Sequence, residues 1–180
     1  GKHEDMNILS EILDEIQVLQ TVRNMDFVSD IYLFGYSQGG VVASMVAGYF
    51  CDIIKALILI VPAAVLRANC EAGDMLGQPY DPKKPPKNII VNIFGEFTFG
   101  EGYLRTGRHL PIYEVAADYE GPVCMVRGND DIIVPLEYCE KYAQIYKNCE
   151  FHKLDGCDHM TICPDQRMHD IILDFLAKNR

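Results

Sequence analysis

The chain has 180 residues, of which 49% are hydrophobic, and its 26 acidic and 16 basic side chains give a formal net charge of −10. This length and composition predict one globular domain with room for an inserted subdomain, and no apolar run reaches the roughly 18 residues that a membrane-spanning helix needs. The acidic charge argues against nucleic acids and anionic membranes as partners.

The first part of the chain predicts a helix, a strand, a second helix and a second strand. Apolar residues recur every three or four positions over residues 4–25, which predicts an amphipathic helix. Residues 31–35 are rich in strand formers, and residues 41–50 are apolar enough for a buried helix. The run 56–61 is apolar on both faces, as in a central parallel strand that helices cover.

Residues 66–117 have a different composition, rich in glycine, proline and aromatic side chains. Within them, Asn88–Phe94 and Phe97–Phe99 flank Gly95 and Glu96 as the strands of a hairpin would. This stretch is too long for a plain connection between core strands, and its aromatic content disfavours a disordered linker. We therefore predict that residues 66–117 are an inserted lid, with residues 1–65 and 118–180 as the core.

The last part of the chain returns to helices that alternate with strands. The expected elements are a short helix at 111–119, a strand at 123–127, a helix at 136–147, a strand at 150–154 and a closing helix at 165–178. This alternation predicts the α/β class, with a mostly parallel sheet flanked by helices.

A Gly-x-Ser-x-Gly pattern joins the first strand to the second helix, with Ser37 at its centre. A sharp turn there would expose the serine hydroxyl as a nucleophile, and Gly35 and Gly39 would remove side chains that collide. The N–H of Gln38 would then lie at a helix start, where it can stabilise an oxyanion. The alternative is a strand-to-helix turn in which the serine only caps the helix.

Two further residues complete the set that nucleophilic acyl transfer needs. Asp131 follows the third predicted core strand and His159 follows the fourth, so all three residues lie where parallel strands end. The order Ser, Asp, His is the one that this architecture uses. We expect His159 to take the proton from Ser37, and Asp131 to hold the imidazole in the correct tautomer.

Other residues compete for these roles. Asp130 is the alternative to Asp131, which we prefer because it stands three residues beyond Gly128 and can turn back over the sheet. The competing histidines are His3, His109, His152 and His169, which fall on helix surfaces, in the lid or within a strand.

Seven cysteines occur, and none forms a Cys-x-x-Cys pair, which predicts reduced thiols in a cytoplasmic protein. No signal peptide is visible at the N-terminus. A metal site is conceivable, but the spacing of its candidate ligands fits no standard zinc pattern, and we expect no metal or other cofactor. Those candidates are Cys149, His152, Cys157, His159 and Cys163.

Four segments together carry a family resemblance: Gly35–Met45, Leu110–Val115, Gly128–Asp131 and Gly156–His159. The chain resembles the α/β-hydrolase superfamily and is most similar, over nearly its whole length, to bacterial cinnamoyl (feruloyl) esterases. The resemblance implies hydrolysis of hydroxycinnamate esters, such as feruloyl and caffeoyl esters, by a fold whose lid binds the phenolic ring. It also implies that Tyr103 and Asn69 contact the phenolic hydroxyl, although Asn69 stands where such enzymes are expected to have an acidic residue.

The chain departs from this family at its front. Family members carry a long segment before the first helix, which supplies the early strands and a second oxyanion donor, whereas Gln38 is the one donor expected here. Losing one donor typically costs about 10²–10³ in rate. The strand at 31–35 would then present an open apolar edge, so we expect either a homodimer or a complementing N-terminal segment.

Two other functions remain open at this point. One is a general carboxylesterase or monoacylglycerol-lipase-like hydrolase, because aromatic residues also line acyl pockets. The other is a catalytically inactive fragment that acts as a binding or assembly module, because of the shortened front.

Overall fold

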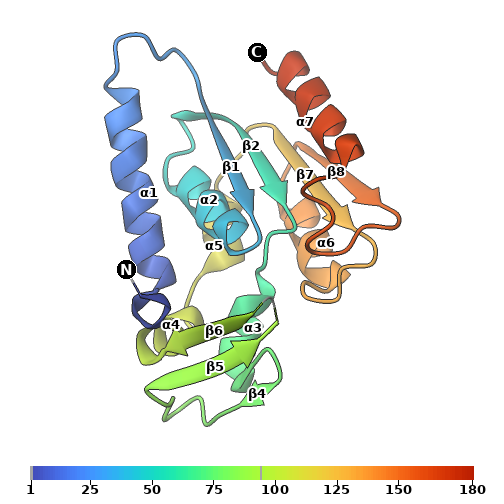
Figure 1. Ribbon diagram of the computed structural model, residues 1–180. Helices are drawn as coiled ribbons and strands as arrows, with labels where there is room; N and C mark the ends of the chain where they lie inside the picture. Colours follow the sequence, from blue (N-terminus) through green and yellow to red (C-terminus); the bar gives the residue numbers. More distant parts are fainter. Residues whose placement is uncertain (1, 94) are drawn as a thin grey trace. The chain divides into compact units, whose positions relative to one another are not determined.

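The computed structural model describes residues 2–93 and 95–180, and it divides the chain into two compact units (Figure 1). The larger unit comprises Glu15–Ala64 and Ile112–Arg180, and the smaller unit comprises Gly1–Asp14 and Val65–Pro111. Within the described residues, no helix is long and apolar enough to cross a bilayer.

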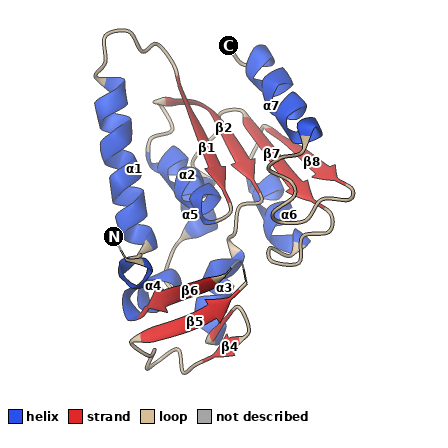
Figure 2. Cartoon of the chain, viewed as in Figure 1, coloured by secondary structure: helices blue, strands red, loops and turns tan. Residues whose placement is uncertain are grey.

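The larger unit is built on a four-stranded parallel sheet with the strand order β1-β2-β7-β8 (Figure 2). Its strands are β1 (Ile31–Tyr36), β2 (Ile54–Ile60), β7 (Val123–Gly128) and β8 (Cys149–Leu154). The two central strands are almost entirely buried, which matches their continuous apolar sequences. The predicted parallel sheet and the α/β class are thus confirmed.

Four of the described helices lie wholly within the larger unit. They are α2 (Gln38–Tyr49), α5 (Ile112–Ala116), α6 (Leu136–Ile145) and α7 (Gln166–Lys178). Helix α5 contacts both α2 and α6, while α7 packs against β7. All three strand-to-helix connections that were expected to carry functional residues therefore leave the same end of the sheet, since every pair of neighbouring strands is parallel.

The smaller unit combines short helices with two antiparallel hairpins. Its elements are η1 (His3–Asp5), α3 (Val65–Ala72), β3 (Asp74–Met75), β4 (Gln78–Pro79), β5 (Asn88–Asn92), β6 (Glu96–Gly100) and α4 (Glu101–Gly107). Strands β5 and β6 form the predicted hairpin, with Asn92 opposite Glu96. Phe94, which the sequence assigned to the first of these strands, lies outside the described residues.

The first helix begins later than its apolar pattern predicted. Helix α1 covers Ile8–Arg23, and residues 3–5 form a separate 3₁₀ turn. The carboxamide oxygen of Asn7 accepts a hydrogen bond from the N–H of Leu9 at 2.9 Å, which starts the helix there because it satisfies an otherwise unpaired N–H of the first turn. The helix expected at 111–119 is also shorter and ends at Ala116.

Candidate active site

Ser37 occupies the turn between β1 and α2 in a backbone conformation that side chains rarely adopt. Its φ is 54° and its ψ is −120°, and the cost of such a conformation is met by the surrounding structure. The N–H of Ser37 donates to the carbonyl of Ile60 at 2.9 Å, and the carbonyl of Ser37 accepts from the N–H of Ala63 at 3.0 Å. The chain that leaves β2 therefore holds this turn on both sides.

Only some glycines of the turn are needed to avoid a collision with neighbouring atoms. A Cβ on Gly35 would lie 2.4 Å from the carbonyl oxygen of Gly39, and a Cβ on Gly40 would lie 3.0 Å from Pro62. A Cβ on Gly39 would meet no atom within 4 Å, so the expectation that Gly39 prevents a collision is wrong. The close approach of β1 and α2 needs Gly35 and favours Gly40 instead.

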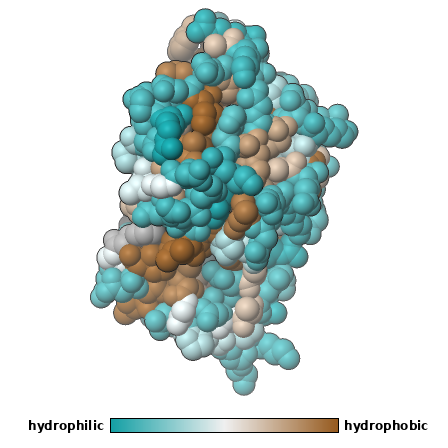
Figure 3. Space-filling model, turned by 90° about the vertical axis from the view of Figure 1, so that its right-hand side faces the viewer, coloured by the Kyte–Doolittle hydropathy of each residue, from teal (hydrophilic) through white to brown (hydrophobic). Residues whose placement is uncertain are grey.

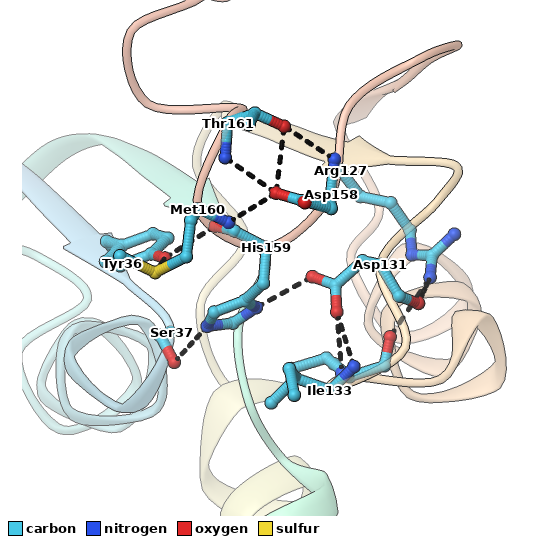
Figure 4. Close-up of polar contacts among 10 residues, drawn as sticks. Tyr36, Ser37, Arg127, Asp131, Ile133, Asp158, His159, Met160 and Thr161 are labelled. Atoms are coloured by element: carbon cyan, nitrogen blue, oxygen red, sulfur yellow. Dashed lines mark hydrogen bonds and ion pairs between the residues drawn. The ribbon is translucent and has the colours of Figure 1, made fainter. Parts of the chain in front are cut away.

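The structure brings Ser37, His159 and Asp131 together in one hydrogen-bonded chain (Figure 4). His159 Nε2 lies 3.0 Å from Ser37 Oγ, and His159 Nδ1 lies 2.7 Å from Asp131 Oδ2. His159 is 4% exposed and Asp131 is 5% exposed. Both distances lie within the range that a nucleophile and its base, and a base and its orienting carboxylate, require.

The second carboxylate oxygen of Asp131 is held by its own loop. Oδ1 accepts hydrogen bonds from the N–H groups of Ile133 at 2.8 Å and Val134 at 2.9 Å. Burial raises the pKa of the Asp131 carboxyl, but the hydrogen bonds from His159, Val134 and Ile133 outweigh it, so that the net pKa lies below its ordinary value. The carboxylate is therefore ionised at neutral pH and can orient the imidazole.

A buried arginine that the sequence analysis did not single out supports the same loop. Arg127 is 3% exposed, and its Nη2 donates to the carbonyl oxygens of Asp131 at 2.9 Å and Val134 at 3.1 Å. The available signal was a charged residue inside the otherwise apolar run 123–128. A buried cation needs such acceptors, and here they shape the loop that carries Asp131.

The loop that carries His159 is held by polar contacts of its own. Asp158 Oδ1 accepts from the N–H groups of Met160 at 2.9 Å and Thr161 at 2.8 Å, and also from the Thr161 hydroxyl. The hydroxyl of Tyr36, the residue before Ser37, donates to the carbonyl oxygen of His159 at 2.6 Å (Figure 4). Sequence reasoning missed Tyr36 because it occupies a variable position of the Gly-x-Ser-x-Gly pattern.

The remaining predicted site residues lie in different places. Gln38 is the first residue of α2 and directly follows Ser37. Asn69 lies on α3 and Tyr103 on α4, both in the smaller unit. Tyr103 is 2% exposed, its ring centroid is 4.7 Å from that of Phe99, and burial raises its pKa. The functions expected of these three residues stay predictions.

The candidate metal ligands do not form a metal-binding group. Among the described residues, no cluster of three or more His, Cys, Asp or Glu side chains has the arrangement to hold a metal ion. His159, the central candidate, is hydrogen-bonded to Asp131 and Ser37 instead. Of the competing histidines, His169 contacts the carbonyl of Cys163, and His152 lies within β8 beside Glu150.

No protein-family model and no curated protein matches the chain. Among solved structures, the chain is similar to Est1E from Butyrivibrio proteoclasticus, with 28% identity and a TM-score of 0.85, over 96% of this chain and 72% of that one. A structure of Est1E with ferulic acid bound matches at the same identity and TM-score, over 97% and 71% of the two chains.

A more distant structure has the same fold. The monoacylglycerol lipase of Paleococcus ferrophilus is 16% identical, with a TM-score of 0.70, over 97% of this chain and 77% of that one. With the parallel sheet and the serine on its strand-to-helix turn, these matches lead to one conclusion. The chain has the α/β-hydrolase fold.

Proposed function

We propose that the protein is a serine esterase that hydrolyses hydroxycinnamate esters through an acyl-enzyme on Ser37. The observation that carries the proposal is the hydrogen-bonded chain from Ser37 Oγ through the His159 imidazole to Asp131. These three groups have the chemistry of a nucleophile, a general base and an orienting carboxylate.

The proposed reaction has two stages. His159 Nε2 takes the proton of Ser37 while Oγ attacks the ester carbonyl, and the N–H of Gln38 at the start of α2 stabilises the oxyanion. His159 then returns this proton to the leaving alcohol as the C–O bond breaks. Water, activated by the same imidazole, releases the acid and restores Ser37. Asp131 stays ionised throughout and stabilises the imidazolium.

The substrate class rests on the resemblance to Est1E, for which a complex with ferulic acid is known. In our proposal the substrate is a small-molecule ester with a feruloyl- or caffeoyl-type acid, and residues 66–117 form the lid over its ring. Asn69 and Tyr103 are the proposed ring contacts. Asn69 is half-buried and Tyr103 is nearly inaccessible, so Asn69 is the more available of the two.

The same proposal includes a partner for the open edge of the sheet. Within the described residues β1 pairs with β2 alone, and Phe34 on β1 is 56% exposed. Such an edge is suited to pairing with another strand. We propose that a second copy of the chain, or a complementing N-terminal segment, covers it.

The test is labelling with a fluorophosphonate, which reacts with activated serines, followed by mass spectrometry of the adduct. We expect a stoichiometric adduct on Ser37 and none in Ser37→Ala. A folded wild-type protein that forms no adduct would contradict the proposal and favour the inactive binding module.

Substrate class needs a second measurement. We expect kcat/KM for methyl ferulate to exceed that for a short aliphatic ester. The opposite preference, with Ser37 still labelled, would favour the general carboxylesterase or monoacylglycerol-lipase-like function.

A further inference from the structure

The three residues of the candidate triad come from loops at two different parts of the sheet edge. Ser37 follows the outer strand β1 and is held by the chain that leaves β2, through Ile60 and Ala63. Asp131 and His159 follow the neighbouring strands β7 and β8 at the other side of the sheet. Correct alignment of the nucleophile with its base therefore depends on contacts that reach across the sheet.

The acid and the base form one tightly joined part. The N–H of Asp130 donates to the carbonyl of Cys157 at 3.0 Å, and the N–H of Asn129 donates to that of Leu154 at 2.9 Å. A Cβ on Gly128 would lie 2.1 Å from the Cys157 carbonyl oxygen, so the two loops meet backbone to backbone. These contacts align Asp131 with His159, but they do not reach β1.

The hydrogen bond between Ser37 and His159 does reach β1, but it cannot last through the reaction. Once Ser37 Oγ is esterified it has no proton to donate, and the imidazole must then activate a water molecule. The base therefore needs a second contact to the nucleophile turn, one that takes no part in the chemistry.

Tyr36 makes such a contact. Its hydroxyl donates to the backbone carbonyl of His159 at 2.6 Å, its ring centroid lies 5.2 Å from the imidazole centroid, and its hydroxyl lies 3.7 Å from the sulfur of Met160. The acceptor is a backbone oxygen, so the bond does not change when the imidazole gains or loses a proton. Burial, with the nearby acidic groups of Cys163, Asp131 and Asp158, raises the pKa of the Tyr36 phenol to about 12, and the phenol keeps its proton at neutral pH.

We propose that Tyr36 is a positioning residue, whose hydrogen bond to the His159 carbonyl keeps the imidazole aligned with the nucleophile turn through acylation and deacylation. This inference rests on the proposed esterase function. The Gly-x-Ser-x-Gly motif leaves the residue between Gly35 and Ser37 variable, and this inference gives that residue a role.

The chain offers a matched control on the same strand. Tyr32 lies four residues earlier on β1, hence on the same face, and its hydroxyl also donates to a backbone carbonyl, that of Asn179, at 2.9 Å. Tyr32→Phe and Tyr36→Phe thus each remove one phenol-to-carbonyl bond from β1, but only Tyr36 contacts the His159 loop.

The experiment compares wild type, Tyr36→Phe and Tyr32→Phe at a temperature where thermal unfolding shows all three to be folded. In Tyr36→Phe we expect the acylation rate with the fluorophosphonate, and kcat for the ester, to fall about 10-fold, since a misplacement of ~1 Å can cost up to ~10²-fold. KM should stay within about twofold, because Tyr36 acts through His159 and not on ground-state binding. Tyr32→Phe should keep wild-type rates while losing a similar amount of thermal stability.

A second readout does not depend on activity. NMR of protein labelled with ¹³C-histidine, with the His159 signal assigned from His159→Gln, should show a shifted or broadened His159 Cε1–H signal in Tyr36→Phe and an unchanged one in Tyr32→Phe. Equal rates and equal His159 signals in the two phenylalanine variants would overturn the role of Tyr36. If the wild type forms no Ser37 adduct, the proposed function fails separately, and the NMR comparison alone decides whether Tyr36 positions His159.

Discussion

At the scale of single residues, the candidate site is held by contacts to backbone atoms as much as by side-chain pairs. Asp131 accepts from two backbone N–H groups, and Arg127 and Tyr36 donate to the carbonyls of Asp131 and His159. Such contacts do not depend on which of Ser37, His159 and Asp131 carries the proton. In the proposed reaction they would keep the geometry constant while charge moves between these residues.

Replacing Asp131 should affect both activity and stability. In Asp131→Asn, we expect kcat to fall about 10³–10⁴-fold, because the amide favours the wrong imidazole tautomer. Assays of ester hydrolysis would measure this loss, and fluorophosphonate labelling of Ser37 would give the fraction of reactive enzyme in each sample. An Asn variant with near wild-type kcat would contradict the role proposed for Asp131 and favour Asp130.

The difference in stability between the wild type and this variant should decrease at low pH. The folded pKa of Asp131 lies below the ordinary value of 3.8, so ionised Asp131 stabilises the fold fully at neutral pH. That contribution is lost as the pH falls through the lowered folded pKa. The difference in unfolding free energy between wild type and Asp131→Asn should therefore shrink below pH 3.8, as denaturant titrations at several pH values would show.

At the scale of elements, the junction of β1 and α2 is the feature on which the site depends. The last residue of β1 donates a hydrogen bond to the carbonyl of His159, the next residue is the proposed nucleophile, and the one after it begins the helix. Strand and helix approach so closely that the carbonyl of Gly39 would lie 2.4 Å from a Cβ on Gly35. The strained φ of Ser37 is the consequence of reversing the chain in so short a distance.

Alanine substitutions at two glycines of this junction should have different effects on stability. Gly35→Ala should lower the free energy of unfolding by about 3 kcal/mol, since the new methyl group has no room. Gly39→Ala should be neutral or stabilising by about 0.5–1 kcal/mol, because Gly39 lies in α2 and a Cβ there meets no atom within 4 Å. Chemical denaturation of both variants measures the difference. Equal destabilisation would contradict the close approach at Gly35.

At the scale of the whole molecule, the face shown in Figure 3 is largely hydrophilic but has apolar areas. Several large apolar side chains are exposed, among them Phe27 at 86% and Phe34 at 56%. Phe34 lies on β1, an edge strand that pairs with β2 alone within the described residues. Natural proteins protect such edges by several means, among them charged residues, especially lysine.

This edge leads to a prediction about assembly. If a second copy covers β1, the wild-type protein should self-associate as its concentration rises, and Phe34→Lys should shift the equilibrium towards the monomer. Sedimentation velocity at several concentrations would measure both. A wild type that stays monomeric throughout would leave a complementing segment, added in trans, as the partner to test for β1.

The sequence by itself determined the α/β class, the parallel sheet and the three residues that meet at the candidate site. Local patterns carry this information, because apolar periodicity defines helices and strands, and parallel strands bring their carboxyl ends to one edge. The same patterns misjudged Gly39 and the start of α1, since neither an open space nor the cap at Asn7 shows in periodicity.

The tertiary structure alone decided which side chains support the candidate triad. Tyr36 and His159 are 123 residues apart in the chain, and Tyr32 and Asn179 are 147 apart, so no local pattern pairs them. The same holds for the buried Arg127, whose acceptors are carbonyl groups and leave no mark on residue identity. Contacts between a side chain and a distant backbone atom exist only once the chain has folded, and for this reason the contact of Tyr36 with His159 was visible only in three dimensions.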